Sequence, residues 1–114
     1  MNSRKLLVID DERELAELVK KRFEANGYEV VTAFDGAAGL QKVSSEKPDL
    51  VILDIMMPKI DGWEVLRRLR SNKATRSLPV IMLTAKGETD DILKAQRDQA
   101  TDYFIKPFES QELL

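Results

Sequence analysis

The chain has 114 residues, 33% of them charged, and a formal net charge of −2. This length suffices for one domain with its own core, and the charge gives no general attraction to nucleic acid or to an anionic membrane. Cysteine and histidine are both absent. Disulfides, thiolate metal sites and imidazole bases are therefore excluded, so carboxylates, hydroxyls and lysines must carry any chemistry. No segment has the pattern of a signal peptide or a membrane span, so we expect a cytoplasmic protein.

Hydrophobic runs and helical periodicity alternate along the chain, with turn residues between them. We expect strands at 6–9, 29–33, 50–53, 80–83 and 103–105, and helices at about 13–26, 35–45, 63–70, 89–98 and 109–114. Strands that alternate with helices at this spacing form right-handed crossovers and a parallel sheet covered on both faces. No linker or repeat interrupts the pattern. We therefore expect a single α/β domain over residues 1–114, with a truncated last helix.

The first three helices have apolar faces that indicate how they pack. The residues expected to face the core are Leu15, Leu18, Val19 and Phe23 in the first helix, Ala37, Leu40 and Val43 in the second, and Val65, Leu66 and Leu69 in the third. Asp35 is the expected N-cap of the second helix, and Gly27 is the expected left-handed stop of the first. Trp63, at the start of the third helix, is expected to pack in the core.

Polar residues follow four of the five expected strands. They are Asp10 and Asp11, Asp54, Thr84 and Lys106. Because the carboxyl ends of parallel strands meet at one edge of a sheet, these side chains are expected to converge. Taken singly, each has an ordinary structural interpretation, since an aspartate after a strand usually caps a loop or the next helix. Their repetition on successive strands favours a functional site centred on Asp54.

The chemistry of this group of residues indicates phosphoryl transfer. Three converging carboxylates repel one another, and a divalent cation relieves that repulsion; Mg²⁺ suits a site made only of oxygen ligands. Lys106 adds a cation and Thr84 a hydroxyl donor, which are suited to holding a phosphoryl group. Phosphoryl transfer requires mainly positioning and charge neutralisation, so a site without histidine is adequate. The nucleophile is then a carboxylate, and the product is an acyl phosphate.

These residues closely resemble the receiver domain of two-component response regulators, over essentially the whole chain. The motifs that carry the resemblance are Asp10-Asp11, Asp54-Ile55-Met56-Met57-Pro58-Lys59-Ile60-Asp61-Gly62, Leu83-Thr84-Ala85-Lys86 and Tyr103-Phe104-Ile105-Lys106-Pro107-Phe108. The resemblance implies a flavodoxin-like (CheY-like), doubly wound fold of strand order 2-1-3-4-5, with the site between the first and third strands. One departure is Gln99, which stands where the family commonly has a glycine near the end of the fourth helix.

The resemblance also implies a role for each acidic residue. Asp54 is expected to accept a phosphoryl group from the phosphohistidine of a sensor histidine kinase or phosphotransfer protein, or from a small acyl or amido phosphate. Asp11 and Asp54 are expected to bind Mg²⁺ directly. The backbone carbonyl of Met56 is expected to be a third ligand, and Asp10 is expected to act through a bound water.

On the neighbouring strands, the resemblance implies that Thr84 and Lys106 hold phosphoryl oxygens, and that Tyr103 rotates inward when Thr84 moves. A cis peptide bond is expected between Lys106 and Pro107. Phosphorylation is expected to switch the surface formed by the fourth helix, fifth strand and last helix. This surface is expected to control a downstream output, and family members often form homodimers through it. We expect a signalling domain rather than an enzyme, which itself binds neither nucleic acid nor a membrane.

Three other interpretations remain. A Mg²⁺-dependent phosphohydrolase would act on an external substrate through an aspartyl-phosphate, but such enzymes often carry Asp-x-Asp after the first strand, whereas Asp10 and Asp11 are adjacent. A flavin or nucleotide carrier on the same fold would need a glycine-rich phosphate loop after the first strand, which the sequence lacks. A degenerate receiver that only binds partners fits poorly with five intact site residues.

Overall fold

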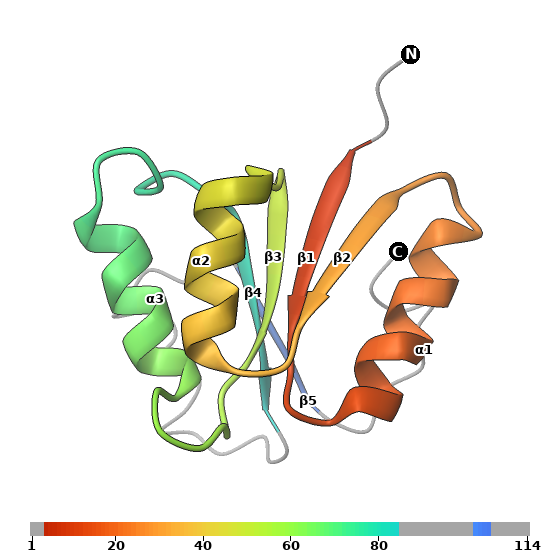
Figure 1. Cartoon of the computed structure of the whole chain (residues 1–114), viewed down its shortest axis with the longest axis horizontal. Coiled ribbons are helices and arrows are strands. Elements are labelled where there is room, and N and C mark those ends of the chain that lie inside the picture. The colour runs from red at the N-terminus through yellow and green to blue at the C-terminus, as the bar shows by residue number, and fades with distance from the viewer. Residues whose placement is uncertain (1–3, 85–101, 106–114) are drawn as a thin grey trace.

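The computed structural model describes residues 4–84 and 102–105, which form a parallel sheet and the helices that cover it (Figure 1). The strands are β1 (Lys5–Ile9), β2 (Glu29–Ala33), β3 (Leu50–Asp54), β4 (Val80–Thr84) and β5 (Asp102–Ile105), and the helices are α1 (Arg13–Glu24), α2 (Gly36–Glu46) and α3 (Gly62–Ser71). The strand order is β2-β1-β3-β4-β5, as predicted. The helices expected at 89–98 and 109–114 lie outside the described residues.

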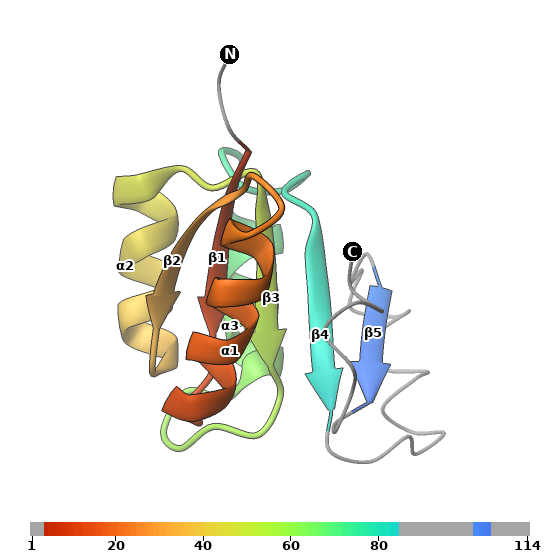
Figure 2. The same ribbon diagram turned by 90° about the vertical axis from the view of Figure 1, so that its right-hand side faces the viewer.

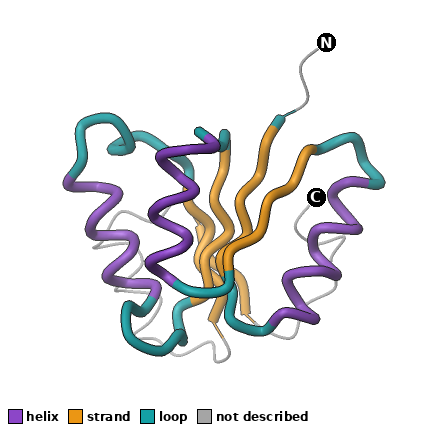
Figure 3. Tube along the Cα trace, viewed as in Figure 1, coloured by secondary structure: helices purple, strands orange, loops and turns teal. Residues whose placement is uncertain are grey.

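Strands β1 and β3 are buried on both faces of the sheet. Successive side chains of a strand point to opposite sides, so each of these strands contributes to two layers of core. Leu7 and Ile9 belong to one core cluster, together with residues of α2 and α3. Leu6 and Val8 belong to a second cluster, together with residues of α1. The strands run in one direction between these two layers, so their carboxyl ends lie along one edge (Figures 2 and 3).

Helix α1 packs on the sheet through a narrower face than the sequence predicts. Val19 and Phe23 are buried as expected, and so is Ala16. The prediction for Leu18 is wrong, because its side chain is 55% exposed. At about 100° per residue, Leu18 lies more than a quarter turn away from the line of buried residues.

Helix α2 lies close against β1 because one of its inward residues, Gly39, has no side chain. Asp35 caps the helix as predicted, since its carboxylate accepts a hydrogen bond from the Ala38 N–H at 2.7 Å. The prediction of a buried Ala37 is wrong: it is exposed, and Gly36 and Gly39 are buried instead. A Cβ atom at Gly39 would lie 2.5 Å from Ile9 Cδ1. The absence of a side chain at Gly39 therefore determines how closely α2 approaches β1.

Helix α3 confirms the prediction for its apolar face: Val65, Leu66 and Leu69 are all buried. Trp63 is also in the core, with 5% of its surface exposed. Asp61 caps the helix by accepting a hydrogen bond from the Glu64 N–H at 3.0 Å. Within the described ranges, no helix is both long enough and apolar enough to cross a bilayer.

Two residues just beyond helix ends have positive φ angles, Gly27 at 91° after α1 and Lys47 at 49° after α2. This conformation is strained for any residue with a Cβ. We expect Lys47→Gly to raise the free energy of unfolding by up to about 1 kcal/mol, measured by urea denaturation.

Gly27→Ala is the matched control: no atom lies within 4 Å of the added Cβ, so its expected loss of about 1 kcal/mol is backbone strain alone. A less stable Lys47→Gly variant would mean that the lysine side chain contributes more than the strain costs.

Candidate metal and phosphoryl site

Three carboxylates meet at the carboxyl edge of the sheet. At this edge β1 and β3 end side by side (Figure 1). One oxygen from each of Asp10, Asp11 and Asp54 lies within 4.8 Å of the other two. The register brings them together: Ile9 pairs with Leu53, so the next residue of each strand is an aspartate at the same height. The predicted convergence of these three residues is therefore confirmed.

The loop between β1 and α1 holds Asp10 firmly and leaves Asp11 at the surface. The Asp10 N–H donates to the Ala33 carbonyl at 3.0 Å, which continues the pairing of β1 with β2. Its carboxylate accepts a hydrogen bond from the Glu12 N–H at 2.9 Å. Asp10 is fully buried, whereas Asp11 is exposed. Asp10 therefore forms the buried side of the acidic cluster, and Asp11 forms its solvent-exposed side.

Asp54 ends the central strand β3 and is 2% exposed. Its carboxylate accepts one long hydrogen bond, 3.4 Å, from the N–H of Met56, a residue that is 71% exposed. The chain then turns back, and the Gly62 N–H donates to the Ile55 carbonyl at 2.9 Å. This turn places Asp54 beside a loop whose residues are mostly exposed.

Gly62 has a structural role in the site that the sequence reasoning missed. A Cβ at this position would lie 2.3 Å from the Asp54 carbonyl oxygen and 2.8 Å from Ile55 Cα. These are backbone atoms of β3 and of the loop that follows it, so they cannot yield as a flexible side chain would. The Asp61-Gly62 pair marks a turn in the sequence, but the close contact with Asp54 becomes visible only in the structure.

The residues present fit a hard divalent cation. Three carboxylates held within one ion's reach carry like charges, and two of them are buried, which favours a compensating cation. An oxygen-only donor set with one exposed member suits Mg²⁺, which usually keeps several waters alongside one or two carboxylates. The acidic cluster can therefore bind a metal ion through its own side chains.

The other predicted site residues lie on β4, on β5 and beyond. Leu83 pairs with Asp54, so Thr84 follows at the carboxyl end of β4. Thr84 in turn pairs with Ile105, and Tyr103 pairs with Met82, so both predicted switch residues lie on neighbouring strands. Lys106 and Pro107 lie outside the described residues. Their roles, the cis bond and the switch remain predictions.

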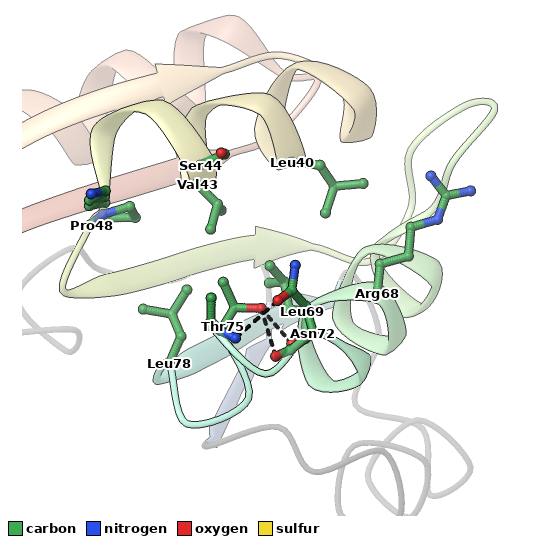
Figure 4. Close-up of a pocket in the computed structure, with 11 residues that line it drawn as sticks. Leu40, Val43, Ser44, Pro48, Arg68, Leu69, Asn72, Thr75 and Leu78 are labelled. Atoms are coloured by element: carbon green, nitrogen blue, oxygen red, sulfur yellow. Dashed lines mark hydrogen bonds between the residues drawn. The ribbon is translucent and has the colours of Figure 1, made fainter.

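A groove of about 520 Å³ opens between the carboxyl ends of α2 and α3 (Figure 4). Val43, Pro48, Leu69 and Leu78 supply apolar walls, and Asn72 and Thr75 supply polar groups. These residues come just before β3 and β4, at the edge of the sheet opposite the carboxylates. The groove is therefore separate from the acidic cluster, and none of the described residues that line it carries a carboxylate.

The family comparison agrees with this geometry. The sequence profile described as "Response regulator receiver domain" matches residues 6–114. Among curated proteins, the alkaline phosphatase synthesis transcriptional regulatory protein PhoP of Bacillus subtilis is 44% identical over 97% of this chain and 45% of its own length. The DNA-binding dual master transcriptional regulator RpaA of Synechocystis is 41% identical over 96% of the chain and 46% of its own length. The chain thus spans about half the length of the curated relatives it matches.

Solved structures show the same architecture. A putative response regulator from Chloroflexus aurantiacus has a TM-score of 0.92 and 38% identity, covering 98% of this chain and 92% of that one. The chemotaxis protein CheY4 of Vibrio cholerae has a TM-score of 0.93 and 29% identity, covering 98% and 93% respectively. The predicted flavodoxin-like fold is therefore confirmed.

Proposed function

Because this chain belongs to the response regulator receiver family, we propose that it accepts a phosphoryl group on Asp54 from a phosphohistidine of a sensor histidine kinase or phosphotransfer protein. The observation that carries the proposal is the gathering of Asp10, Asp11 and Asp54 within 4.8 Å at the carboxyl edge of the sheet. The donor can also be a small acyl or amido phosphate, because the nucleophile and the residues around it belong to the receiver itself.

In the transfer step, a carboxylate oxygen of Asp54 forms a bond to phosphorus. The bond from phosphorus to the imidazole nitrogen of the donor breaks, and that nitrogen keeps the electron pair. The product is an aspartyl phosphate, which water later cleaves to aspartate and inorganic phosphate. Asp54 is only 2% exposed, so few directions of approach are open to the donor, and this restriction helps to align it for in-line attack.

Mg²⁺ is the cation that this site is proposed to hold. Asp11 and Asp54 would hold it directly through their carboxylates, the Met56 carbonyl would be the third protein ligand, and Asp10 would act through a water. When bound, Mg²⁺ neutralises charge that develops on the phosphoryl oxygens. Asp10 keeps its orientation through the hydrogen bond from the Glu12 N–H, so this carboxylate is oriented before the donor arrives.

The phosphorylated state is proposed to switch the surface of the domain. Thr84 donates a hydrogen bond to one phosphoryl oxygen and Lys106 pairs with another, and Tyr103 turns inward as Thr84 moves. The added charge, about −2 with three acceptor oxygens, biases the domain toward its active state. The surface of the fourth helix, fifth strand and last helix then controls a downstream output, in part by homodimer formation.

Removal of the metal tests this function. We expect the chain incubated with acetyl phosphate and Mg²⁺ to gain the mass of one phosphoryl group, and to gain none when EDTA replaces Mg²⁺, because the unneutralised carboxylates repel the anionic donor. Intact-protein mass spectrometry measures both. Equal mass gain with EDTA would contradict the metal assignment. Sustained turnover of a generic phosphate ester would instead support the phosphohydrolase interpretation, which the similarity to response regulators does not favour.

A further inference from the structure

The first residue of α1 lies on an aromatic ring of a different loop. The guanidinium carbon of Arg13 is 4.1 Å from the centroid of the Phe34 ring. Arg13 comes two residues after Asp11, and Phe34 follows the last residue of β2. This cation–π contact therefore joins the loop that carries Asp11 to the neighbouring connection between β2 and α2.

Phe34 is a fixed platform for this contact. Its side chain is partly buried and packs against the core cluster beneath α1. On one side it is preceded by Ala33, whose carbonyl accepts the hydrogen bond from Asp10. On the other side it is followed by Asp35, which caps α2. Hydrogen bonds hold both Ala33 and Asp35 in place. The Phe34 ring between them is therefore the fixed partner of the contact, and it restrains the Arg13 side chain.

Arg13 itself stands where local rules disfavour it. The positive end of a helix dipole lies at its N-terminus, so a cation in the first position costs some stability. The N-cap residue, Glu12, does not cap the helix with its side chain. Conflicts of this kind between local preference and structure are expected at functional sites. A cation that lowers helix stability here points to a role outside the helix.

We propose that the Arg13–Phe34 contact positions Asp11 for the divalent cation. Asp11 is exposed and lies between two anchors: Asp10, which is tied to β2, and Arg13, which is tied to Phe34. The second anchor limits how far the Asp11 carboxylate moves from the other two acids. Arg13 is thus a positioning residue. The inference rests on the proposed function of the acidic cluster as a Mg²⁺ site.

The Arg13–Phe34 contact and the Arg13 charge are expected to affect Mg²⁺ affinity in opposite directions. The two effects can therefore be measured separately. Removing the Arg13 charge on its own would tighten Mg²⁺ binding, because like charges repel. Removing the Phe34 ring leaves that charge in place and abolishes only the contact. A weakening caused by Phe34→Leu is therefore an effect of position and not of charge.

The test is a double-mutant cycle on Mg²⁺ binding, measured by isothermal titration calorimetry. Phe34→Leu is expected to raise the Mg²⁺ dissociation constant by about two- to fivefold, the equivalent of the ~0.5–1 kcal/mol of an exposed cation–π contact. In the Arg13→Met background the same substitution is expected to leave the Mg²⁺ dissociation constant unchanged.

Phe34→Tyr keeps the ring face and Arg13→Lys keeps the cation, so both variants are expected to retain most of the Mg²⁺ affinity of the unaltered chain. Lys21→Met, on the last turn of the same helix, is the charge control and is expected to leave binding unchanged.

Three outcomes would overturn the inference. Unchanged Mg²⁺ affinity in Phe34→Leu would show that the contact does not position Asp11. Equal weakening in both backgrounds would show that Phe34 acts through core packing alone. In either case phosphoryl uptake by the unaltered chain would leave the proposed function standing. If the unaltered chain does not bind Mg²⁺, the metal site and this inference both fail, whereas binding without phosphoryl uptake would contradict the acceptor role only.

Discussion

Asp54→Asn is expected to abolish phosphoryl uptake from acetyl phosphate and Mg²⁺. Asparagine has nearly the same shape, so the buried end of β3 keeps its packing, but the amide offers no anionic oxygen to attack phosphorus. It also removes one of the three charges that favour the cation. The expected mass gain falls from one phosphoryl group per chain to none, measured on the intact protein. Peptide mapping of the unaltered chain is expected to place the group on Asp54.

A matched control lies in the same loop. Asp61→Asn makes the same chemical change at the exposed N-cap of α3, where asparagine caps as well as aspartate. This variant is expected to take up phosphoryl as the unaltered chain does. Undiminished mass gain in Asp54→Asn would refute the acceptor assignment, and loss of mass gain in both variants would point to a general effect of the loop.

Gly62→Ala is expected to damage both the stability and the chemistry of the domain. The added Cβ would overlap the Asp54 carbonyl oxygen, a backbone atom of β3. Overpacking of this kind costs about 1–3 kcal/mol, measured as a lower free energy of unfolding in urea. Relief of the overlap moves the turn after Asp54. A displacement of about 1 Å can slow a positioned reaction up to about a hundredfold, so the rate of phosphoryl uptake is expected to fall as well.

Gly27→Ala separates these two effects. It is also a glycine-to-alanine change with an expected loss of stability. However, it lies just after α1, where no atom is within 4 Å of the added Cβ. Its rate of phosphoryl uptake is expected to be unchanged. If Gly62→Ala loses stability and keeps the rate of the unaltered chain, the close contact supports the fold and not the acceptor geometry.

The acidic part of the site was predictable because it follows from strand ends. Asp10 and Asp54 each come directly after a run of apolar residues, and a parallel register brings such ends together without further information. Asp11 needed no more than its place next to Asp10. The roles of Thr84 and Lys106 rest on the same reasoning and remain predictions.

Other contacts could not be read from residue patterns. Helical periodicity allowed Leu18 to be counted with the core, but it is exposed, because only the orientation of α1 on the sheet decides which edge of its apolar face is covered. The Arg13–Phe34 contact joins two different loops, and no pattern of residues marks it. Gly62 belongs to the same short stretch as Asp54, but the pattern of that stretch does not show that the two backbones touch.

The sequence alone determined the alternation of strands and helices and the edge at which three carboxylates gather, since both follow from local hydrophobic pattern and from parallel crossovers. The order of the strands came from the resemblance to receiver domains, and the structure confirms it. The tertiary structure decided which residues α1 and α2 bury, how closely Gly39 lets α2 approach β1, and which ring Arg13 contacts. The physical reason is that close contact depends on distances between packed surfaces of about an atom's width. A pattern of residue types along a chain indicates which surfaces meet, but it does not specify their separation.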